Sequence, residues 1–310
     1  MEGDKMFQHI LVPLDGSRLA ESALVTAGWL AGKMDAQLTF IHLIERNAPS
    51  KVHSERHLVT REEATRYLDE VSRGPGLAGL RITTHVHEVE VSDVARSIFE
   101  HSAELAPDLI VMCAHGTGGV RRLLFGVIAQ QVITLGKTPV LIVYPSPGRR
   151  EAEEAGEIRS IIAPIDGDMD HERSLPIAAG LAKALKCRLR LLMVVPKIKD
   201  LTGSEGAVSF MLPGSTRTEL EMESVAARGY LDRRVEDLVK TGIAVEAETS
   251  RGDPAHAIIS AARRLSSGLV VMGTHGRAGT EAFWEGSVAA EVAARIRIPL
   301  LLVPLGKRDD

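Results

Sequence analysis

The chain has 310 residues, of which 45% are hydrophobic, and a formal net charge of −4. This length exceeds the usual size of a single hydrophobic core, so two domains are expected. The weakly acidic balance provides no broad basic surface, which excludes a protein that acts mainly by neutralising nucleic-acid phosphates.

Short β-branched runs alternate with alanine-rich helical patterns along the first half of the chain. In chain order, we expect a strand at 9–14, a helix at 20–34, a strand at 38–44, a longer helix, a strand at 84–90, a helix at 93–105, a strand at 109–114, another helix and a strand at 139–144. This alternation is typical of a parallel sheet covered on both faces. Right-handed crossovers make such a sheet doubly wound, and its ligands bind at the carboxyl ends of strands where the strand order reverses.

The second half of the chain repeats the first. Asp166 takes the place of Asp15 at an offset of 151 residues, and His275 that of His115 at an offset of 160 residues. Nine residues are therefore inserted between these points, and the Gly, Ser, Thr and Pro content of residues 199–218 predicts that they form a loop. We predict two tandem α/β domains with Rossmann-like, doubly wound parallel sheets, at 1–147 and 158–310, joined by a linker at 148–157.

The cysteine content and the apolar runs indicate in which cellular compartment the protein is found. Two cysteines, Cys113 and Cys187, are too few for a disulfide framework. The acidic opening segment reaches its apolar run too late and too briefly for a signal peptide. No apolar run approaches the ~18 residues that a membrane-spanning helix needs. We therefore expect a soluble protein of the cytoplasm.

A glycine pattern in the second copy is typical of phosphate binding. Gly273 and Gly276 end an apolar strand, and after nine intervening residues Gly286 and Ser287 begin an alanine-rich helix. Glycines let backbone N–H groups approach an anion closely, and the helix dipole and the serine hydroxyl add to the attraction. The alternative is that these glycines are only turn and cap residues. The presence of the same frame in both copies favours the phosphate site.

Asp166 and the two loop histidines each allow two interpretations. Asp166 directly follows a strand and could accept hydrogen bonds from ribose hydroxyls, or it could form an Asx-turn or cap a helix. His115 and His275 lie inside the glycine loops, where each could donate to a ligand or hold the loop closed by bonding to the backbone.

These motifs resemble the ATP-binding branch of the universal stress protein family, and the resemblance covers nearly the whole chain twice. It implies that Asp166 contacts the ribose, that the backbone of Val194 contacts the adenine, and that the glycine motif holds the phosphates with Mg²⁺ or Mn²⁺. It also implies a dimer built through the last strands. Because each copy ends in an apolar strand that would otherwise be an exposed edge, we expect the two copies to pack as a pseudo-dimer and the chains to form a homodimer on top of it. The complete set of expected ATP-binding residues is Pro164, Asp166, Val194, Met272, Gly273, His275, Gly276, Gly286, Ser287 and Val288.

The first copy departs from this pattern at two positions. Cys113 stands where the second copy has Gly273, and Val127 stands where it has Ser287. A degenerate site is therefore expected, in which nucleotide binds weakly or not at all. Its residues are Pro13, Asp15, Leu43, Met112, His115, Gly116 and Gly126.

Histidine pairs raise the question of a metal site. His53 and His57 are spaced to lie on one face of a helix, and His85 and His87 lie on one side of a strand. Because no cysteine or third fixed ligand stands nearby, a polar loop and a solvated strand face are the expected alternatives. Elsewhere, Asp253 is expected to cap a helix that begins at Pro254.

The residues favour nucleotide binding over catalysis. No nucleophile with a paired base stands near the glycine loop, so an enzyme is not expected beyond weak ATP hydrolysis. Slow hydrolysis or self-phosphorylation stays open as an alternative, because a phosphate cradle with a metal already stabilises transferring charge. A dimeric scaffold that needs no nucleotide is the third possibility. We expect no nucleic acid or membrane partner.

Overall fold

A computed structural model describes residues 6–46, 51–52, 55–114, 126–145, 158–169, 171–197, 211–264, 268–275 and 287–305. The chain divides into two compact units. Unit 1 contains the described residues up to 145, together with His275 and residues 297–305, and unit 2 contains the described residues 158–274 and 287–296.

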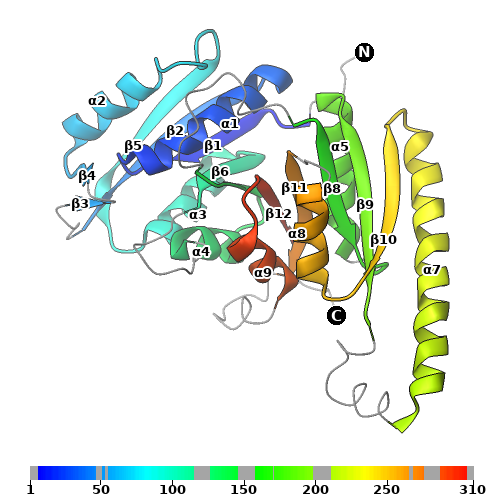
Figure 1. Ribbon diagram of the computed structural model, residues 1–310. Helices are drawn as coiled ribbons and strands as arrows, with labels where there is room; N and C mark the ends of the chain where they lie inside the picture. The colour runs from blue at the N-terminus through cyan, green and yellow to red at the C-terminus, as the bar shows by residue number, and fades with distance from the viewer. Residues whose placement is uncertain are drawn as a thin grey trace. The chain divides into compact units, whose positions relative to one another are not determined.

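Unit 1 is built on a six-stranded sheet in the order β5-β2-β1-β6-β7-β12, with a separate β3-β4 hairpin. Neighbouring strands are parallel except β7 and β12, which are antiparallel. Figure 1 shows α1 and α2 on one face of this sheet and α3 and α4 on the other. The elements are β1 (His9–Pro13), α1 (Arg18–Met34), β2 (Gln37–Glu45), β3 (Lys51–Val52), β4 (Glu55–Arg56), α2 (Arg61–Val71), β5 (Arg81–Val91), α3 (Val94–Leu105), β6 (Leu109–Cys113), α4 (Val127–Leu135), β7 (Val140–Val143) and β12 (Leu300–Leu305).

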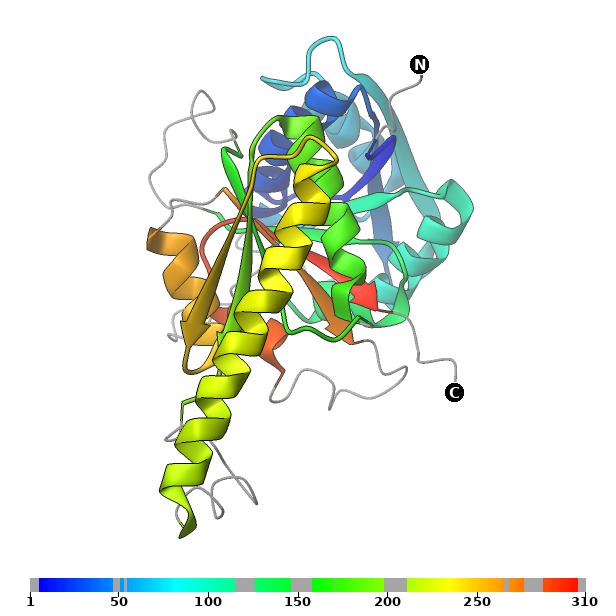
Figure 2. The ribbon, with the colours of Figure 1, turned by 90° about the vertical axis from the view of Figure 1, so that its right-hand side faces the viewer.

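Unit 2 is built on four parallel strands in the order β10-β9-β8-β11. The long helix α7 packs along β9 and β10, and Figure 2 shows that its N-terminal part extends beyond the ends of these strands. The elements are β8 (Ser160–Ile165), the 3-10 helix η1 (His171–Arg173), α5 (Ser174–Leu185), β9 (Arg188–Val195), α7 (Pro213–Val239), β10 (Val245–Arg251), α8 (Pro254–Arg264), β11 (Leu269–His275) and α9 (Val288–Arg295).

Both sheets follow from the apolar patterns of their strands. The central strands of unit 1 are buried on both faces, with Ile10, Leu11 and Phe40 at 0% exposure. A strand that is covered by helices on both faces has no solvated side, so it is continuously apolar rather than alternating. The predicted class, α/β with doubly wound parallel sheets, is confirmed.

The strand order reverses between the first and fourth strands of each copy. In unit 1 the chain steps outward from β1 to β2 and β5, and then returns to β6 on the other side of β1. Unit 2 does the same with β8, β9 and β10 before β11. Each reversal places the carboxyl ends of two adjacent strands beside helices that leave in opposite directions, which is the usual ligand position in such sheets.

The last strands of the two sequence copies pair with each other. Leu300 to Leu302 of β12 lie antiparallel to Val140 to Ile142 of β7. Because these residues are almost fully buried, the ladder covers two apolar edges that would otherwise be exposed.

Two predicted elements were wrong in extent. The helix expected to be long in the first copy is α2, with 11 residues, and it is shorter than α1 with 17. In the second copy, residues 213–218 were predicted as loop, yet they form the start of α7. A proline at the first position of a helix is favourable, and the serine and threonines that follow are tolerated there. The composition of this segment therefore predicted a loop where a helix begins. Residues 198–210 lie outside the described part.

The helix cap that was predicted at Asp253 is present in the structure. Asp253 accepts a hydrogen bond from the backbone N–H of His256 at 2.7 Å, at the start of α8. The expected cap before Pro254 is therefore confirmed.

Candidate functional site

The candidate site of unit 2 is a cavity at the carboxyl ends of β8 and β9. Asp166 directly follows β8, and Val194 lies at the end of β9, the neighbouring strand. Both residues line one cavity of about 440 Å³. The structure therefore brings these two residues together, although 28 positions in the sequence separate them.

Asp166 and its counterpart Asp15 form the same local turn. The backbone N–H of Asp168 donates to Oδ1 of Asp166 at 3.0 Å, and that of Ser17 donates to Oδ1 of Asp15 at 2.9 Å. The Asx-turn interpretation is thus correct for both carboxylates. It does not exclude ligand binding, since the side chain of Asp166 stays 58% exposed, and its second oxygen contacts Nδ1 of His171.

The residue after each aspartate must be glycine. Gly167 has a φ of +86°, and a Cβ built there would lie 2.9 Å from Cε of Met193, in the cavity lining. Gly16 has a φ of +87°, and its Cβ would lie 2.8 Å from Leu58. Only glycine adopts this backbone without strain, so the turn that presents the carboxylate depends on it.

The opposite wall of the cavity comes from α7. Ala226, Ala227, Tyr230 and Arg233 recur at helical spacing on one face of this helix and line the cavity. No sequence motif pointed to these residues, because α7 shares no motif with the first copy. The helical spacing of these residues is a signal that could have found them.

A buried ionic network fixes α7 to the segment that follows Asp166. The carboxylate of Glu172 in η1 is 6% exposed, and its Oε2 lies 2.6 Å from Nη2 of Arg234. Tyr230 donates its hydroxyl to Oε1 of Glu172, and Nε of Arg234 donates to the Tyr230 hydroxyl at 3.1 Å. These contacts hold the cavity wall in place because they tie Tyr230 to the aspartate's own loop.

Part of the predicted phosphate motif is described. Met272 and Gly273 lie in β11, next to Pro164 in β8 on the sheet. Ser287 precedes α9, and its Oγ accepts from the backbone N–H of Ala290 at 3.1 Å, so it caps this helix. Val288 is 38% exposed. Gly276, Gly286 and the side chain of His275 lie outside the described residues.

Thr274 is a residue that the sequence analysis passed over. It is 1% exposed, and its hydroxyl has no hydrogen-bond partner among the described residues. A buried hydroxyl without a partner is costly, so such a group usually faces a ligand or an ordered water. The position of Thr274 inside the glycine motif could have drawn attention to it.

The described residues of the degenerate site lie at the corresponding strand ends of the first copy. Leu43 and Met112 are buried in β2 and β6, and Pro13 ends β1. The Sγ of Cys113 accepts a hydrogen bond from the Ser22 hydroxyl at 3.1 Å. Burial, together with the charge of Asp15, raises the pKa of this thiol to about 11, so it is neutral near pH 7.

The helix of the degenerate motif lacks a polar cap. Gly126 precedes α4 without a side-chain capping bond, and Val127 is 66% exposed at the first helical position. The loop residues His115 and Gly116 lie outside the described part of the chain.

The helical placement of the first histidine pair was wrong. Thr60 caps α2, which begins at Arg61, so His57 precedes the helix, and residues 51–56 contain a short hairpin. His57 is 6% exposed, with Nε2 3.9 Å from Oε2 of Glu45. His53 lies outside the described residues.

The second histidine pair is partly exposed on β5, and a third imidazole, which the sequence did not predict, lies beside it. His85 and His87 do lie on one side of β5, but His101 of α3 packs against both rings. The third imidazole was missed because it stands 14 residues beyond His87, on a different element.

Comparison with known proteins identifies the family. The sequence profile described as "Universal stress protein family" matches residues 6–144 and again residues 157–304. The chain therefore belongs to the universal stress protein family, with the domain present in tandem.

Individual relatives agree with this assignment. Over 305 residues the chain is 25% identical to a universal stress protein of Mycolicibacterium smegmatis, covering 95% of this chain and 96% of that protein. It is 29% identical over 150 residues to the universal stress protein YxiE of Bacillus subtilis, covering 44% of this chain and 99% of YxiE.

Solved structures show the same fold. The protein PA1789 from Pseudomonas aeruginosa PAO1 has a TM-score of 0.67 at 17% identity, covering 98% of this chain and 95% of that one. A universal stress protein from Archaeoglobus fulgidus has a TM-score of 0.63 at 16% identity, covering 98% of both chains. Among the described residues, no helix is long and apolar enough to cross a membrane.

Proposed function

We propose that the second copy binds ATP together with Mg²⁺ or Mn²⁺, and that the protein acts as a nucleotide-dependent regulator or sensor in a stress response. The observation that carries this proposal is the cavity that Asp166 and Val194 share at the carboxyl ends of β8 and β9. Membership of the universal stress protein family supports it.

The residues at the cavity fit an adenine nucleotide. Its volume of about 440 Å³ lies within the range of roughly 300–1,000 Å³ found for small-molecule sites. The exposed carboxylate of Asp166 suits ribose hydroxyls, and the backbone of Val194 suits the edge of an adenine ring. A divalent ion bound with the phosphates would neutralise their charge.

The test is isothermal titration calorimetry of the full chain with Mg-ATP. Asp166→Ala should weaken binding about 10–100-fold, because hydrogen bonds to a charged group contribute about 1.5–3 kcal/mol. The matched control is Asp15→Ala, the same change in the degenerate copy, which should leave the main affinity unchanged. Equal effects of the two variants would contradict the assignment.

The glycine motif offers a second test of the same site. The double variant Gly276→Val, Gly286→Val should lose ATP affinity because side chains would hold the phosphates away from the backbone N–H groups. Full affinity in a variant with an unchanged circular dichroism spectrum would argue against a phosphate site there.

The two copies are expected to differ. We propose one tightly bound ATP per chain, with the first copy empty or weakly occupied, because Cys113 and Val127 replace a glycine and a serine. Loss of one hydroxyl donor costs about 0.5–1.5 kcal/mol, which is about 2–13-fold in affinity. Equilibrium dialysis should show one site per chain, and Cys113→Gly, Val127→Ser should add a second. Two equal sites in the unaltered chain would refute the asymmetry.

Mass spectrometry of ligand released from the purified protein separates the three modes of action. Retained ATP supports the sensor, ADP supports slow hydrolysis, and neither nucleotide supports a scaffold. We further propose a cytoplasmic homodimer. The buried, unbridged Cys113 and Cys187 are consistent with a reducing compartment, and a mass near twice 33.5 kDa in light scattering would support the dimer.

A further inference from the structure

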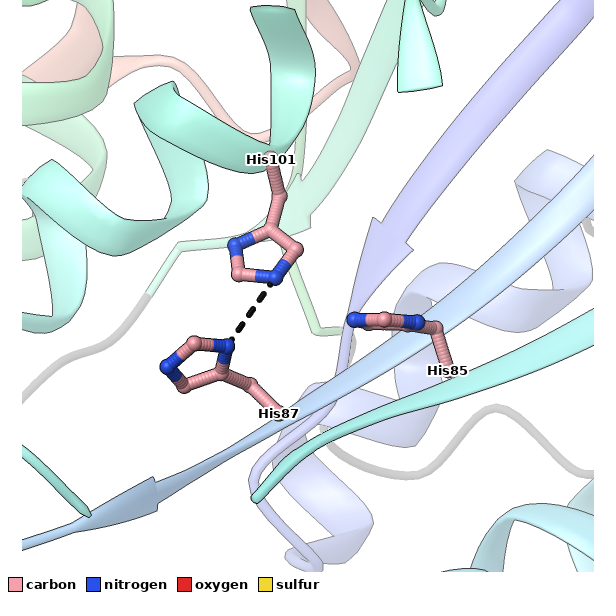
Figure 3. Close-up of side chains that lie close together, drawn as sticks. All are labelled: His85, His87 and His101. Carbon is pink, nitrogen blue, oxygen red and sulfur yellow. Dashed lines mark hydrogen bonds between the residues drawn. The ribbon is translucent and has the colours of Figure 1, made fainter. Parts of the chain in front are cut away.

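Three imidazoles from two elements of unit 1 meet in one cluster. His85 and His87 project from the same face of β5, since they are two positions apart on a strand. His101 reaches them from α3, and one ring nitrogen of each side chain lies within 4.8 Å of the other two. Figure 3 shows the three rings facing one another, with Nδ1 of His87 3.2 Å from Nε2 of His101.

The hydrogen bonds around His101 fix which of its nitrogens faces the cluster. Its Nδ1 lies 2.8 Å from the carbonyl oxygen of Ser97, so Nδ1 carries the proton and donates it to that carbonyl. In the neutral ring Nε2 carries the lone pair, and this nitrogen faces His87. A ligating histidine almost always donates its other ring N–H to a carbonyl or carboxylate in this way, which holds the ring in place for the metal.

His85 supplies a ring nitrogen that has no hydrogen-bond partner among the described residues. Its Nε2 is buried, and it makes no hydrogen bond to any described residue. The ring centroid lies 4.9 Å from that of His101. Burying a polar nitrogen without a partner is costly, so a bound ion at the centre of the cluster would relieve that cost.

We propose that His85, His87 and His101 bind one divalent transition-metal ion, with Zn²⁺ as the natural candidate. Two nitrogens on a tetrahedral Zn²⁺ at about 2.0–2.1 Å from the ion lie about 3.3–3.4 Å apart. The observed 3.2 Å between His87 and His101 is close to this value. His85 must approach further, which a side-chain rotation allows because this residue is only partly buried.

The donor set defines the class of ion. Three imidazoles suit Zn²⁺, Ni²⁺ and Cu²⁺, whereas Mg²⁺ and Mn²⁺ prefer oxygen ligands. This site therefore differs from the one proposed for the ion that accompanies ATP, and the inference does not depend on nucleotide binding. Three protein ligands leave a fourth position of a tetrahedral ion open to water or another donor.

The experiment titrates Co²⁺ into the metal-free full chain, produced without a histidine tag. Tetrahedral Co²⁺ has intense visible absorption, and we expect it to saturate at one ion per chain and to be displaced by Zn²⁺. Loss of an outer-shell partner weakens metal binding about 10–100-fold, and His87→Ala removes a ligand itself. We therefore expect His87→Ala to weaken Co²⁺ binding by at least this factor. The matched control is His256→Ala, an exposed histidine of α8 in unit 2, which should leave binding unchanged.

Two further variants keep the result interpretable. His85→Ala removes a partly buried ligand and should behave like His87→Ala, with circular dichroism verifying the fold. Asp166→Ala should retain full Co²⁺ binding even where it loses ATP, which separates this inference from the proposed function. Binding that is undiminished in His85→Ala or His87→Ala, or no tetrahedral absorption in the unaltered chain, would overturn the proposal.

Discussion

The contact between Glu172 and Arg234 should contribute strongly to the stability of unit 2. Glu172 is 6% exposed and depends on two donors, the guanidinium of Arg234 at 2.6 Å and the hydroxyl of Tyr230. Removing one partner of a fully buried ion pair costs about 3–5 kcal/mol. Because the side chain of Arg234 is 27% exposed, water reaches the pair, and we discount the cost of Arg234→Met to about 2–3 kcal/mol.

A double-mutant cycle measures this coupling. Glu172→Gln keeps a hydrogen-bonding group of the same size and should cost about 1–2 kcal/mol. The double variant Glu172→Gln, Arg234→Met should cost less than the two single changes together, by about 1–2 kcal/mol, because the unpaired carboxylate is no longer present. Tyr230→Phe should also destabilise, since it removes the second donor.

The assay is urea unfolding followed by far-UV circular dichroism, with hydrogen exchange of α7 assigning the loss to unit 2. The control is Arg295→Met, which breaks an exposed pair with Glu291 in α9 and should cost no more than about 0.5 kcal/mol. If the effects of Glu172→Gln and Arg234→Met simply add, or if Arg234→Met is as mild as Arg295→Met, the buried network does not stabilise the unit as argued.

Three other predictions concern single positions. Burial is the main cause that lowers the pKa of His42, whose Nδ1 lies 2.8 Å from the Leu14 carbonyl oxygen. The charge of His57 lowers this pKa further, whereas the charge of Asp15 raises it. The unfolded state then takes up the proton first, so stability should fall as the pH drops below about 6.5, and His42→Asn should flatten this acid limb in urea titrations at pH 7 and pH 5. Gly167→Ala should destabilise unit 2 by about 1–2 kcal/mol because of its positive φ, and thermal unfolding no different from the unaltered chain would contradict this. Ser287→Ala should cost about 1 kcal/mol through the lost helix cap but Ser287→Gly only a few tenths, and a reversed order in denaturant unfolding would exclude capping as the cause.

Local patterns in the sequence determined the elements and their order. Continuously apolar strands such as β1 and β6 predict a sheet buried on both faces, and their alternation with helices predicts parallel pairing. The repeat of Asp15 at Asp166 predicts two domains of one kind. Asp253 before Pro254 predicts a cap, because capping depends only on neighbouring residues. The strand and cap inferences need information only within one element or its immediate neighbours, and the repeat needs only a comparison of the two halves of the sequence.

Loop composition and helix spacing were less reliable. Residues 213–218 have the composition of a loop but lie in α7, because a proline favours the first position of a helix and the serine and threonines after it are tolerated in the first turns. His57 has helical spacing from His53 but precedes α2, since Thr60 caps the helix three residues later.

Only the tertiary structure decided which distant residues share a site. The cavity beside Asp166 takes its opposite wall from α7, about 60 residues along the chain, and Glu172 finds its partners there. His101 joins His85 and His87 because α3 packs on the face of the sheet where β5 presents them. A periodic pattern states which face of an element is apolar, but it does not state which element covers that face. That choice depends on crossovers and packing between segments far apart in sequence, and these exist only in the folded chain.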